Sequence, residues 1–512
     1  MRIQNSIKNM YVSIITQIVI IILGFLSRMV FINSLGTEYL GVNGLLTSIL
    51  SMLSLVEGGI GTSIVYNLYK PLAENDTNKV IALVQLYKKL YGILAIVIFI
   101  LSTVMYVALG RFIKGGTTVP FIGVVYFIFV VKNVISYLNA HKWSLINADQ
   151  KGYIIAKYNL IFNIITTLTK IVILKLTKNY ILYLLIDLGI FMLQNIYNGK
   201  IVSDRYEYIN TKDNYHVDED TKKNLVTNVK AIFLHNIGGY CVFGTDNLLI
   251  STFININTVG LYSNYTMVIS QLASLLTPLL NGMGNSIGNL IATECKEKIY
   301  EIFNVMYLIN FWIYSFCAIS LYNLLEPFID WCFGRGLLLD KLTLIVILIN
   351  FYISGLRNSI GTFKQKAGIY DKDKYQPLIE SAINLVASII LVKYWGLSGI
   401  FMGTTISSIL IPLRIQPKIV FKDVFNKPVK AYFKKYVYYI FLTIIAGIVT
   451  TNICNLIDIA NDFMSLVVKG IVCVSIPNII YLIIFYRSSE FKYILSIILK
   501  IAKVTKPKSV TL

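Results

Sequence analysis

Long apolar runs dominate the chain, and short polar segments separate each run from the next. A window of about 19 residues, the length a helix needs to cross the hydrocarbon core of a bilayer, marks the candidate spans. We expect fourteen of them, at 12–32, 42–66, 90–109, 119–138, 158–174, 180–197, 231–254, 259–280, 302–324, 342–356, 377–392, 396–413, 436–454 and 466–486. Several runs are short, so twelve spans is the alternative count. The pattern predicts an all-α polytopic membrane protein.

The polar segment after the sixth run divides the spans into sets. We expect a first lobe of six helices at 1–200, a cytoplasmic linker at 201–228 and a second lobe of six helices at 229–420. Two further helices at 421–487 and a basic amphipathic cytoplasmic tail at 488–512 complete the chain. Placing 41–53 over 260–272 aligns Gly41 with Gly260 and Thr47 with Thr266. This similarity predicts parallel repeats in a pseudo-twofold arrangement, with a substrate site near the bilayer midplane.

The chain is strongly basic, with 46 Lys and Arg against 26 Asp and Glu, and 56% of its residues are hydrophobic. Most of the basic residues fall in segments that share one side of the membrane if the N-terminus is inside. This is the positive-inside pattern, so we expect both termini in the cytoplasm. The charge therefore reflects topology and contact with membrane lipids, and no nucleic-acid partner is expected. The six cysteines are scattered and indicate neither disulfides nor a metal site.

A few charged residues lie inside the apolar spans, where a charge is costly and usually faces a protein interior or a wet cavity. Arg28 lies about 12 Å from the outer turn, too deep to reach the interface easily, and we expect it to face the cargo. Glycines come directly after Glu57 and shortly before Asp246, so helix packing competes with a substrate-binding role for both acids. Arg357 lies nearer the cytoplasmic end, where it either snorkels or lines the mouth of the cavity. These four residues are our candidate substrate-binding set.

Two further charges fall at similar depth on adjacent helices. Lys170 and Asp187 lie about 10 and 15 Å from the turn near Lys178, and we interpret them as a structural ion pair. Lys132 lies toward the cytoplasmic end of its span and is expected to snorkel to the interface.

Motifs for nucleotide or metal chemistry are missing from the sequence. It has no G-x-x-x-x-G-K-[ST] loop and no H-E-x-x-H helix, so we expect no cofactor and no bound metal. Two D-x-D triplets, at 218–220 and 371–373, occur in short cytoplasmic segments without room for a nucleotide-binding domain. We interpret them as solvated charge. A membrane transporter is therefore expected rather than an enzyme, and a polytopic glycosyltransferase or polymerase is a weaker alternative because the outer loops are short.

Several stretches resemble one known family. The runs SLGTEYLGVNGL at 34–45, EGGIGTSIVY at 57–66 and YKPLA at 69–73 are similar to the opening of the polysaccharide transport proteins. The runs GLRNSIGTFK at 355–364, AGIY at 367–370 and YQPLIE at 375–380 resemble a later part of the same proteins. These are Wzx-type flippases for O-antigen and capsule repeat units, within the multidrug/oligosaccharidyl-lipid/polysaccharide exporter (MOP) superfamily.

The resemblance implies a two-lobed bundle in the bacterial plasma membrane that opens alternately to its two sides. The implied cargo is an undecaprenyl-diphosphate-linked oligosaccharide, moved from the inner to the outer leaflet, whose diphosphate Arg28 would hold. The resemblance leaves open whether H+ or Na+ is coupled to transport. It also leaves open whether the protein contacts a polysaccharide polymerase and glycosyltransferases. A cation-coupled multidrug exporter of the same superfamily is the main alternative: Glu57 favours it, whereas the lack of an acid in the first span opposes it.

Overall fold

The computed structural model describes residues 2–58, 60–219, 222–223, 240, 244–369 and 371–505, and within them it is helical, without strands. In these ranges ten helices are long and apolar enough to cross a membrane, or up to eleven if the bent pair α5 (Ile122–Leu138) and α6 (Ala140–Ala148) forms one span. The expected all-α polytopic class is therefore confirmed. Half of the span predicted at 231–254 lies outside the described residues, and the total of fourteen stays a prediction.

The chain forms two compact units, 1–271 and 272–512. Unit 1 contains α5, α6 and the elements α1 (Arg2–Leu35), α2 (Thr37–Leu53), η1 (Ser54–Glu57), α3 (Ile60–Ala73), α4 (Thr77–Ala108), η2 (Leu109–Phe112), α7 (Tyr153–Thr177), α8 (Tyr180–Arg205), η3 (Glu207–Asn210), α10 (Asp246–Phe253) and the start of α11 (Ile256–Thr293). The unit boundary falls within α11, after Gln271. The lobe boundaries expected from the sequence stay a prediction.

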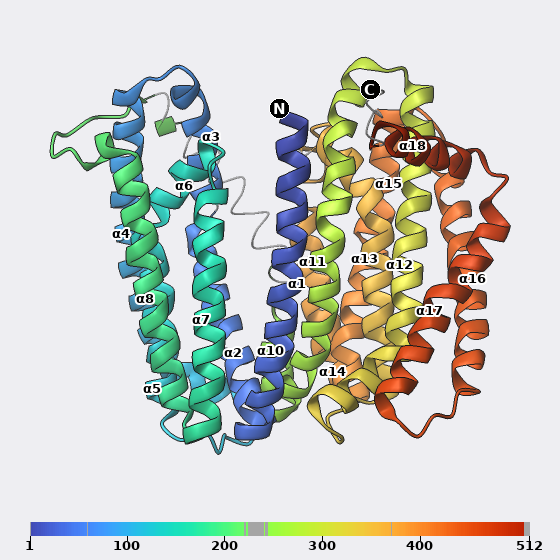
Figure 1. Cartoon of the computed structure of the whole chain (residues 1–512), viewed down its shortest axis with the longest axis horizontal. Helices are drawn as coiled ribbons and strands as arrows, with labels where there is room; N and C mark the ends of the chain where they lie inside the picture. Colours follow the sequence, from blue (N-terminus) through green and yellow to red (C-terminus); the bar gives the residue numbers. More distant parts are fainter. Residues whose placement is uncertain are drawn as a thin grey trace, which may run out of the picture. The chain divides into compact units, whose positions relative to one another are not determined.

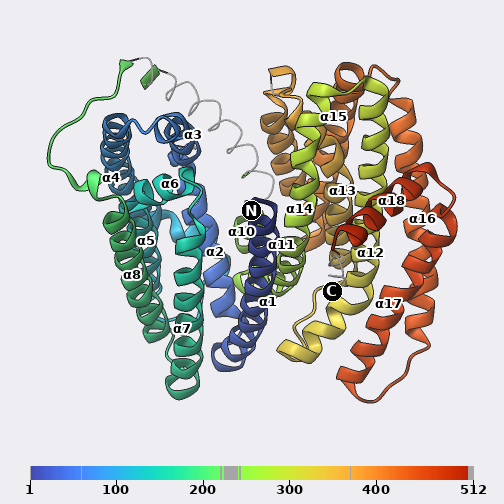
Figure 2. The same ribbon diagram turned by 45° about the horizontal axis from the view of Figure 1, so that its top comes forward.

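Within unit 1, α7 packs against both α1 and α8, and α5 packs against α4 and α8 (Figures 1 and 2). A buried apolar cluster that includes Leu83, Tyr87, Leu145 and Val202 joins the ends of α4, α6 and α8. Helix α7 also carries a stripe of exposed apolar side chains, Ile161, Ile165, Leu168, Val172 and Leu176. Spacing of three and four residues places them on one helix face, which suits contact with lipid tails.

The second predicted span is not a continuous helix. We expected one helix over 42–66, but α2 ends at Leu53 and is followed by the 3-10 turn η1 and by Gly58. Gly58 has φ +60°, a left-handed conformation that glycine adopts at little cost. The chain then resumes as α3, which packs against α6. This break places Glu57 at a helix end.

The starts of α2 and α11 cross at unusually close range. A Cβ atom added to Gly41 would lie 1.9 Å from the carbonyl oxygen of Ile256, and one added to Gly260 would lie 2.0 Å from the carbonyl oxygen of Thr37. Each glycine thus faces the carbonyl four residues before the other glycine. The contact is reciprocal, as a local twofold relationship between the two helix starts requires.

Unit 2 contains the rest of the chain. Its elements are α12 (Lys296–Phe333), α13 (Lys341–Lys366), η4 (Asp371–Asp373), α14 (Gln376–Leu410), α15 (Pro412–Val420), the π-helical turn η5 (Phe421–Phe425), α16 (Lys430–Asn455), α17 (Asp462–Phe485) and α18 (Ser489–Thr505). Helix α12 is central, packing against α13, α16 and α17. Stacked rings join these helices: the centroids of Phe311 and Tyr439 are 4.2 Å apart, and those of Tyr307 and Tyr432 are 5.2 Å apart.

Two features of unit 2 refine the sequence prediction. The spans expected at 377–392 and 396–413 fall in α14 and the start of α15, and α14 is kinked at Gly396, where φ is +57°. The tail helix α18 runs across the bundle and contacts α12 (Figures 1 and 2). Its first turn is fixed by Glu490, whose Oε1 accepts a hydrogen bond from Lys435 Nζ at 2.8 Å.

Candidate functional site

A pocket of about 440 Å3 lies inside unit 1, between α1, α2, α7, α8, α10 and α11. The lining side chains of α1, α2, α7 and α11 are three or four residues apart, so each of these helices presents a single face to the pocket. The lining residues are Ile20, Gly24, Ser27, Arg28 and Phe31 from α1, Leu40, Asn43, Gly44 and Thr47 from α2, Asn163 and Thr167 from α7, Tyr183 from α8, Asn247 from α10, and Ser263, Met267 and Gln271 from α11. We call this the Arg28 pocket.

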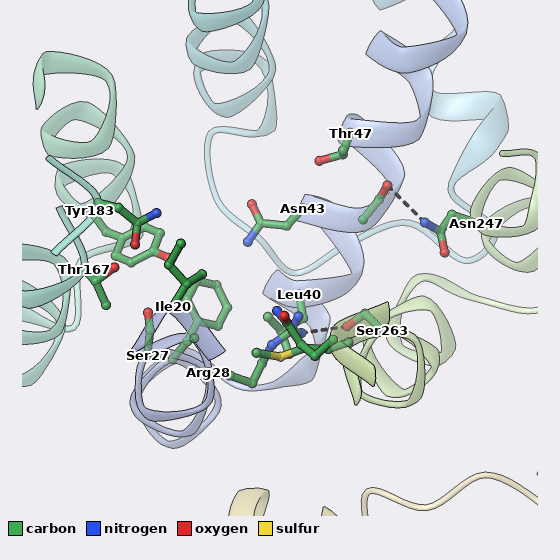
Figure 3. A pocket seen from close by; sticks show the side chains of 16 residues that line it. Ile20, Ser27, Arg28, Leu40, Asn43, Thr47, Thr167, Tyr183, Asn247 and Ser263 are labelled. Carbon is green, nitrogen blue, oxygen red and sulfur yellow. Dashed lines mark hydrogen bonds between the residues drawn. The ribbon is translucent and has the colours of Figure 1, made fainter. Parts of the chain in front are cut away.

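Arg28 is the one charged side chain among these lining residues. Its Nη1 donates a hydrogen bond to Ser263 Oγ at 2.8 Å, across from α1 to α11 (Figure 3). None of the ion pairs within the described ranges includes Arg28. Because a guanidinium carries five N–H donors, the single bond to Ser263 leaves donors free for a further acceptor. Among the described residues, the pocket therefore offers a positive charge without a carboxylate to neutralise it.

The remaining wall of the Arg28 pocket is neutral and polar. Four of its lining residues are Asn43, Thr47, Thr167 and Tyr183 (Figure 3). Asn247 donates to Ser48 Oγ at 3.0 Å, while its own buried Oδ1 has no hydrogen-bond partner. A buried carbonyl without a donor costs free energy, and a hydroxyl or amide of a bound molecule would satisfy it.

A second set of charges adjoins the pocket through Tyr183. Lys170 Nζ lies 3.1 Å from Asp187 Oδ1 and 4.3 Å from the centre of the Tyr183 ring. Lys132, which we expected to snorkel, instead forms an ion pair with the other oxygen of Asp187. The sequence did not indicate this contact, because the position of Lys132 along α5 does not show that α5 packs against α8. Two cations share one anion, so this region of unit 1 has a net positive charge.

The other candidate residues occupy separate environments. Glu57 Oε1 accepts a hydrogen bond from Tyr91 Oη at 3.4 Å, and Asp246 Oδ2 accepts one from Tyr262 Oη at 3.2 Å. Neither carboxylate lines the Arg28 pocket, although Asn247 and Ser263, the neighbours of Asp246 and Tyr262, do. The role of both acids in binding stays a prediction.

Arg357 lies in unit 2 beside an acid. Its Nη1 is 3.2 Å from Glu380 Oε1, which joins α13 to α14. The side chain of Glu380 is 8% exposed and that of Arg357 is 20% exposed, so the pair is largely shielded. A shielded pair neutralises most of the field of its cation. Arg357 therefore differs from Arg28 in having a built-in counter-charge.

The structure adds lining residues that the sequence did not single out, among them Asn43, Asn163, Asn247, Ser263 and Gln271. Each is a polar residue within an apolar stretch, and Asn43–Thr47, Asn163–Thr167 and Ser263–Gln271 follow helical spacing. That spacing was the signal in the sequence that each helix has a polar face. The sequence does not show that the polar faces of α2, α7 and α11 line one pocket, because this depends on how the helices pack.

The fold is shared with solved membrane transporters. The structure titled "Lipid II flippase MurJ, inward closed conformation" is 15% identical, with a TM-score of 0.65, covering 92% of this chain and 98% of that one. An inward-facing multidrug resistance MATE family transporter of the MOP superfamily is 13% identical, with a TM-score of 0.60, covering 78% and 95%. A MOP superfamily transporter from Pyrococcus furiosus, described by the reverse polarity of its binding pocket, is 13% identical, with a TM-score of 0.52, covering 79% and 93%.

These likenesses show the class of fold: a multi-pass helical membrane protein built like the MOP-superfamily transporters. No protein-family model and no curated protein matches the chain. The particular cargo is therefore argued from the site.

Proposed function

We propose that the protein is a flippase that moves undecaprenyl-diphosphate-linked oligosaccharide repeat units from the inner to the outer leaflet of the bacterial plasma membrane. In this proposal it works by alternating access, with both termini in the cytoplasm, and serves the synthesis of a surface polysaccharide. The observation that carries the proposal is the Arg28 pocket, in which Arg28 is the one charged lining residue and has donors to spare.

The chemistry of this pocket suits a diphosphate. Arginine binds phosphate oxygens through parallel N–H donors, and charge-assisted bonds of this kind are stronger than neutral ones. The nearby Lys132–Asp187–Lys170 cluster adds positive potential without competing for the anion. The Asn, Thr and Ser side chains of the wall suit the hydroxyl groups of attached sugars. The likeness to a lipid II flippase supports the same class of cargo.

A cationic drug is less well matched to the Arg28 pocket. A cation in a buried site requires a carboxylate or an aromatic cage to compensate its lost hydration. No acid lines the Arg28 pocket in the described part of the chain, and Arg28 would repel a second cation. Glu57 and Asp246 lie outside its lining, so a drug would need a different site.

The membrane potential favours outward movement of an anionic cargo. An inside-negative potential contributes about 2.3 kcal/mol per charge per 100 mV. We therefore propose that the potential drives flipping, with or without a coupled H+ or Na+. A polysaccharide polymerase and glycosyltransferases are proposed contacts, because they would consume and supply the cargo.

The test uses cells depleted of this protein while the polysaccharide pathway stays intact. The leaflet that holds the lipid-linked oligosaccharide is determined by its accessibility to an external glycosidase or lectin. We expect accumulation on the cytoplasmic leaflet, relieved by the wild type, in part by Arg28→Lys and not by Arg28→Ala. Arg335→Ala is the matched control because Arg335 is exposed and lies 3.4 Å from Asp462 in unit 2. Normal outer-leaflet delivery in depleted cells would refute the proposed cargo.

A further inference from the structure

A second pocket in unit 1, of about 360 Å3, lies between α5, α6, α7 and α8. Its polar lining includes five side-chain amides, Asn147, Asn159, Gln194, Asn195 and Asn198, and its aromatic lining includes Trp143 and Phe191. No charged side chain is among the residues that line it. We call it the amide pocket.

The amides are held in place by one another. Asn159 Oδ1 accepts hydrogen bonds from Asn198 Nδ2 at 2.7 Å and from Gln194 Nε2 at 2.8 Å. Asn195 Oδ1 accepts from Asn139 Nδ2 at 2.5 Å, so a neighbouring amide fixes its orientation too. The pairing spans α7 and α8 and orients the amide groups around the cavity.

One acceptor of this network is left over. Asn198 is 3% exposed, and its Oδ1 has no hydrogen-bond partner, although its Nδ2 is bound. A buried acceptor without a donor is costly, and a cavity beside it offers room for the missing partner.

The lining selects the ligand by chemistry. An anion would need a cation or several convergent N–H donors, and a cation would need a carboxylate. None of the described residues that line this pocket is charged. Amide side chains both donate and accept, as sugar hydroxyl and N-acetyl groups do. An indole ring such as that of Trp143 provides a flat apolar surface with one polar edge. This combination fits a neutral saccharide.

The two pockets follow one another along α7. Asn163 and Thr167 line the Arg28 pocket, while Ala156 and Asn159 line the amide pocket. Asn159 and Asn163 are one helical turn apart, about 6 Å along the axis, a separation comparable to one sugar ring. The linings of the two pockets therefore come within one helical turn of each other on α7.

The geometry points to the amide pocket as the saccharide subsite of unit 1, which binds the first sugars of a lipid-linked oligosaccharide while Arg28 holds its phosphate. The inference rests on the proposed function, since it takes the Arg28 pocket as the anion subsite. It adds that the protein recognises the sugar directly and not only the lipid diphosphate.

Native mass spectrometry of the purified full-length protein tests this inference with two probes. One is undecaprenyl diphosphate, and the other is the same lipid carrying a single N-acetylglucosamine. We expect the wild type to bind the sugar-bearing lipid about tenfold more tightly than the bare one, as one or two added hydrogen bonds would provide. Asn159→Leu should remove this preference and leave binding of the bare lipid unchanged. Gln194→Leu is a second variant with the same expected effect, and both positions are partly or fully exposed, so folding is expected to survive.

The outcomes separate the inference from the proposed function. Arg28→Ala should weaken binding of both lipids. The control Asn323→Leu should change neither, because Asn323 donates only to the carbonyl of Ile319 in its own helix, at 2.9 Å. Equal binding of both lipids by the wild type, or equal weakening of both by Asn159→Leu, would overturn the saccharide subsite and leave the proposed function standing. If neither lipid binds the wild type, or Arg28→Ala has no effect on either, the proposed function itself fails.

Discussion

Gly41 and Gly260 lie against one another where α2 crosses α11: a Cβ atom added to Gly260 would be 3.2 Å from the backbone nitrogen of Gly41. The two positions also align in the sequence repeat. The side chains of Thr37 and Asn257, close to these glycines, form a hydrogen bond across the same crossing. Two equivalent helix starts thus meet at a point that admits no side chain. We interpret the crossing as the place where the pseudo-twofold relationship is fixed.

Any side chain at this crossing should destabilise the protein. Gly260→Ala would place a methyl group 2.0 Å from the carbonyl oxygen of Thr37, so the helices must separate. Overpacking of this kind costs about 1–3 kcal/mol, and we expect a lower melting temperature in detergent, measured by size-exclusion chromatography after heating. Gly92→Ala is the control, since nothing lies within 4 Å of its Cβ position in α4. An unchanged melting temperature for Gly260→Ala would show that the close crossing is absent in solution.

Asp187 should matter more for stability than either lysine that it binds. Asp187→Asn leaves Lys132 and Lys170 facing each other without an anion, and Lys170 is the more shielded of the two. Removing one partner of a buried ion cluster is destabilising, because the remaining charge stays uncompensated. We expect the melting temperature to fall in Asp187→Asn and to recover in Lys170→Met/Asp187→Asn. Failure of the second substitution to restore stability would argue against a simple charge imbalance.

Arg357 and Arg28 should differ in their effect on transport. Glu380 already neutralises Arg357, whereas none of the described residues that line the Arg28 pocket is acidic. We expect Arg28→Ala to abolish export and Arg357→Ala to reduce it only in part, with both proteins inserted at wild-type levels. Surface polysaccharide per cell, normalised to the amount of membrane-inserted protein, measures the difference. Equal losses would assign Arg357 a direct share in cargo binding.

Asp149, in the turn between α6 and α7, gives the protein a pH-dependent contact. Burial raises the pKa of Asp149, but hydrogen bonds from Lys151 and Tyr206 outweigh it and hold the pKa below the ordinary 3.8. A depressed pKa stabilises the folded state above the unfolded pKa, and this contribution is lost as the pH falls through the folded value. We expect Asp149→Asn to lower the melting temperature at neutral pH. The difference in melting temperature from the wild type should shrink below about pH 4. A difference that stays constant with pH would show that Asp149 stabilises the fold by packing and not by its charge.

The sequence predicted the features that follow from periodicity and composition. The apolar runs predicted the long helices. The isolated charge of Arg28 indicated a polar interior, because a buried cation must face protein or water. The repeat alignment identified Gly41 and Gly260, although not that they touch. Each of these inferences uses neighbours along one helix.

What the sequence could not predict depends on contacts between helices. The break at Gly58 and the kink at Gly396 require left-handed backbone angles that a hydropathy window does not detect. The ion pair of Lys132 with Asp187 and the hydrogen bond of Asn198 to Asn159 join residues far apart in the chain. Their partners become evident only once α5, α7 and α8 are packed.

The most direct test is flipping by the purified protein in vesicles. A fluorescent polyprenyl-diphosphate oligosaccharide is placed in both leaflets, and the fraction reached by a membrane-impermeant quencher is followed with and without an imposed potential. We predict rapid flipping by the wild type, acceleration when the potential drives the anion in the direction measured, and no flipping above empty vesicles for Arg28→Ala. Flipping by Arg28→Ala at the wild-type rate would contradict the account, because the cargo would then cross without the charge that is proposed to hold it.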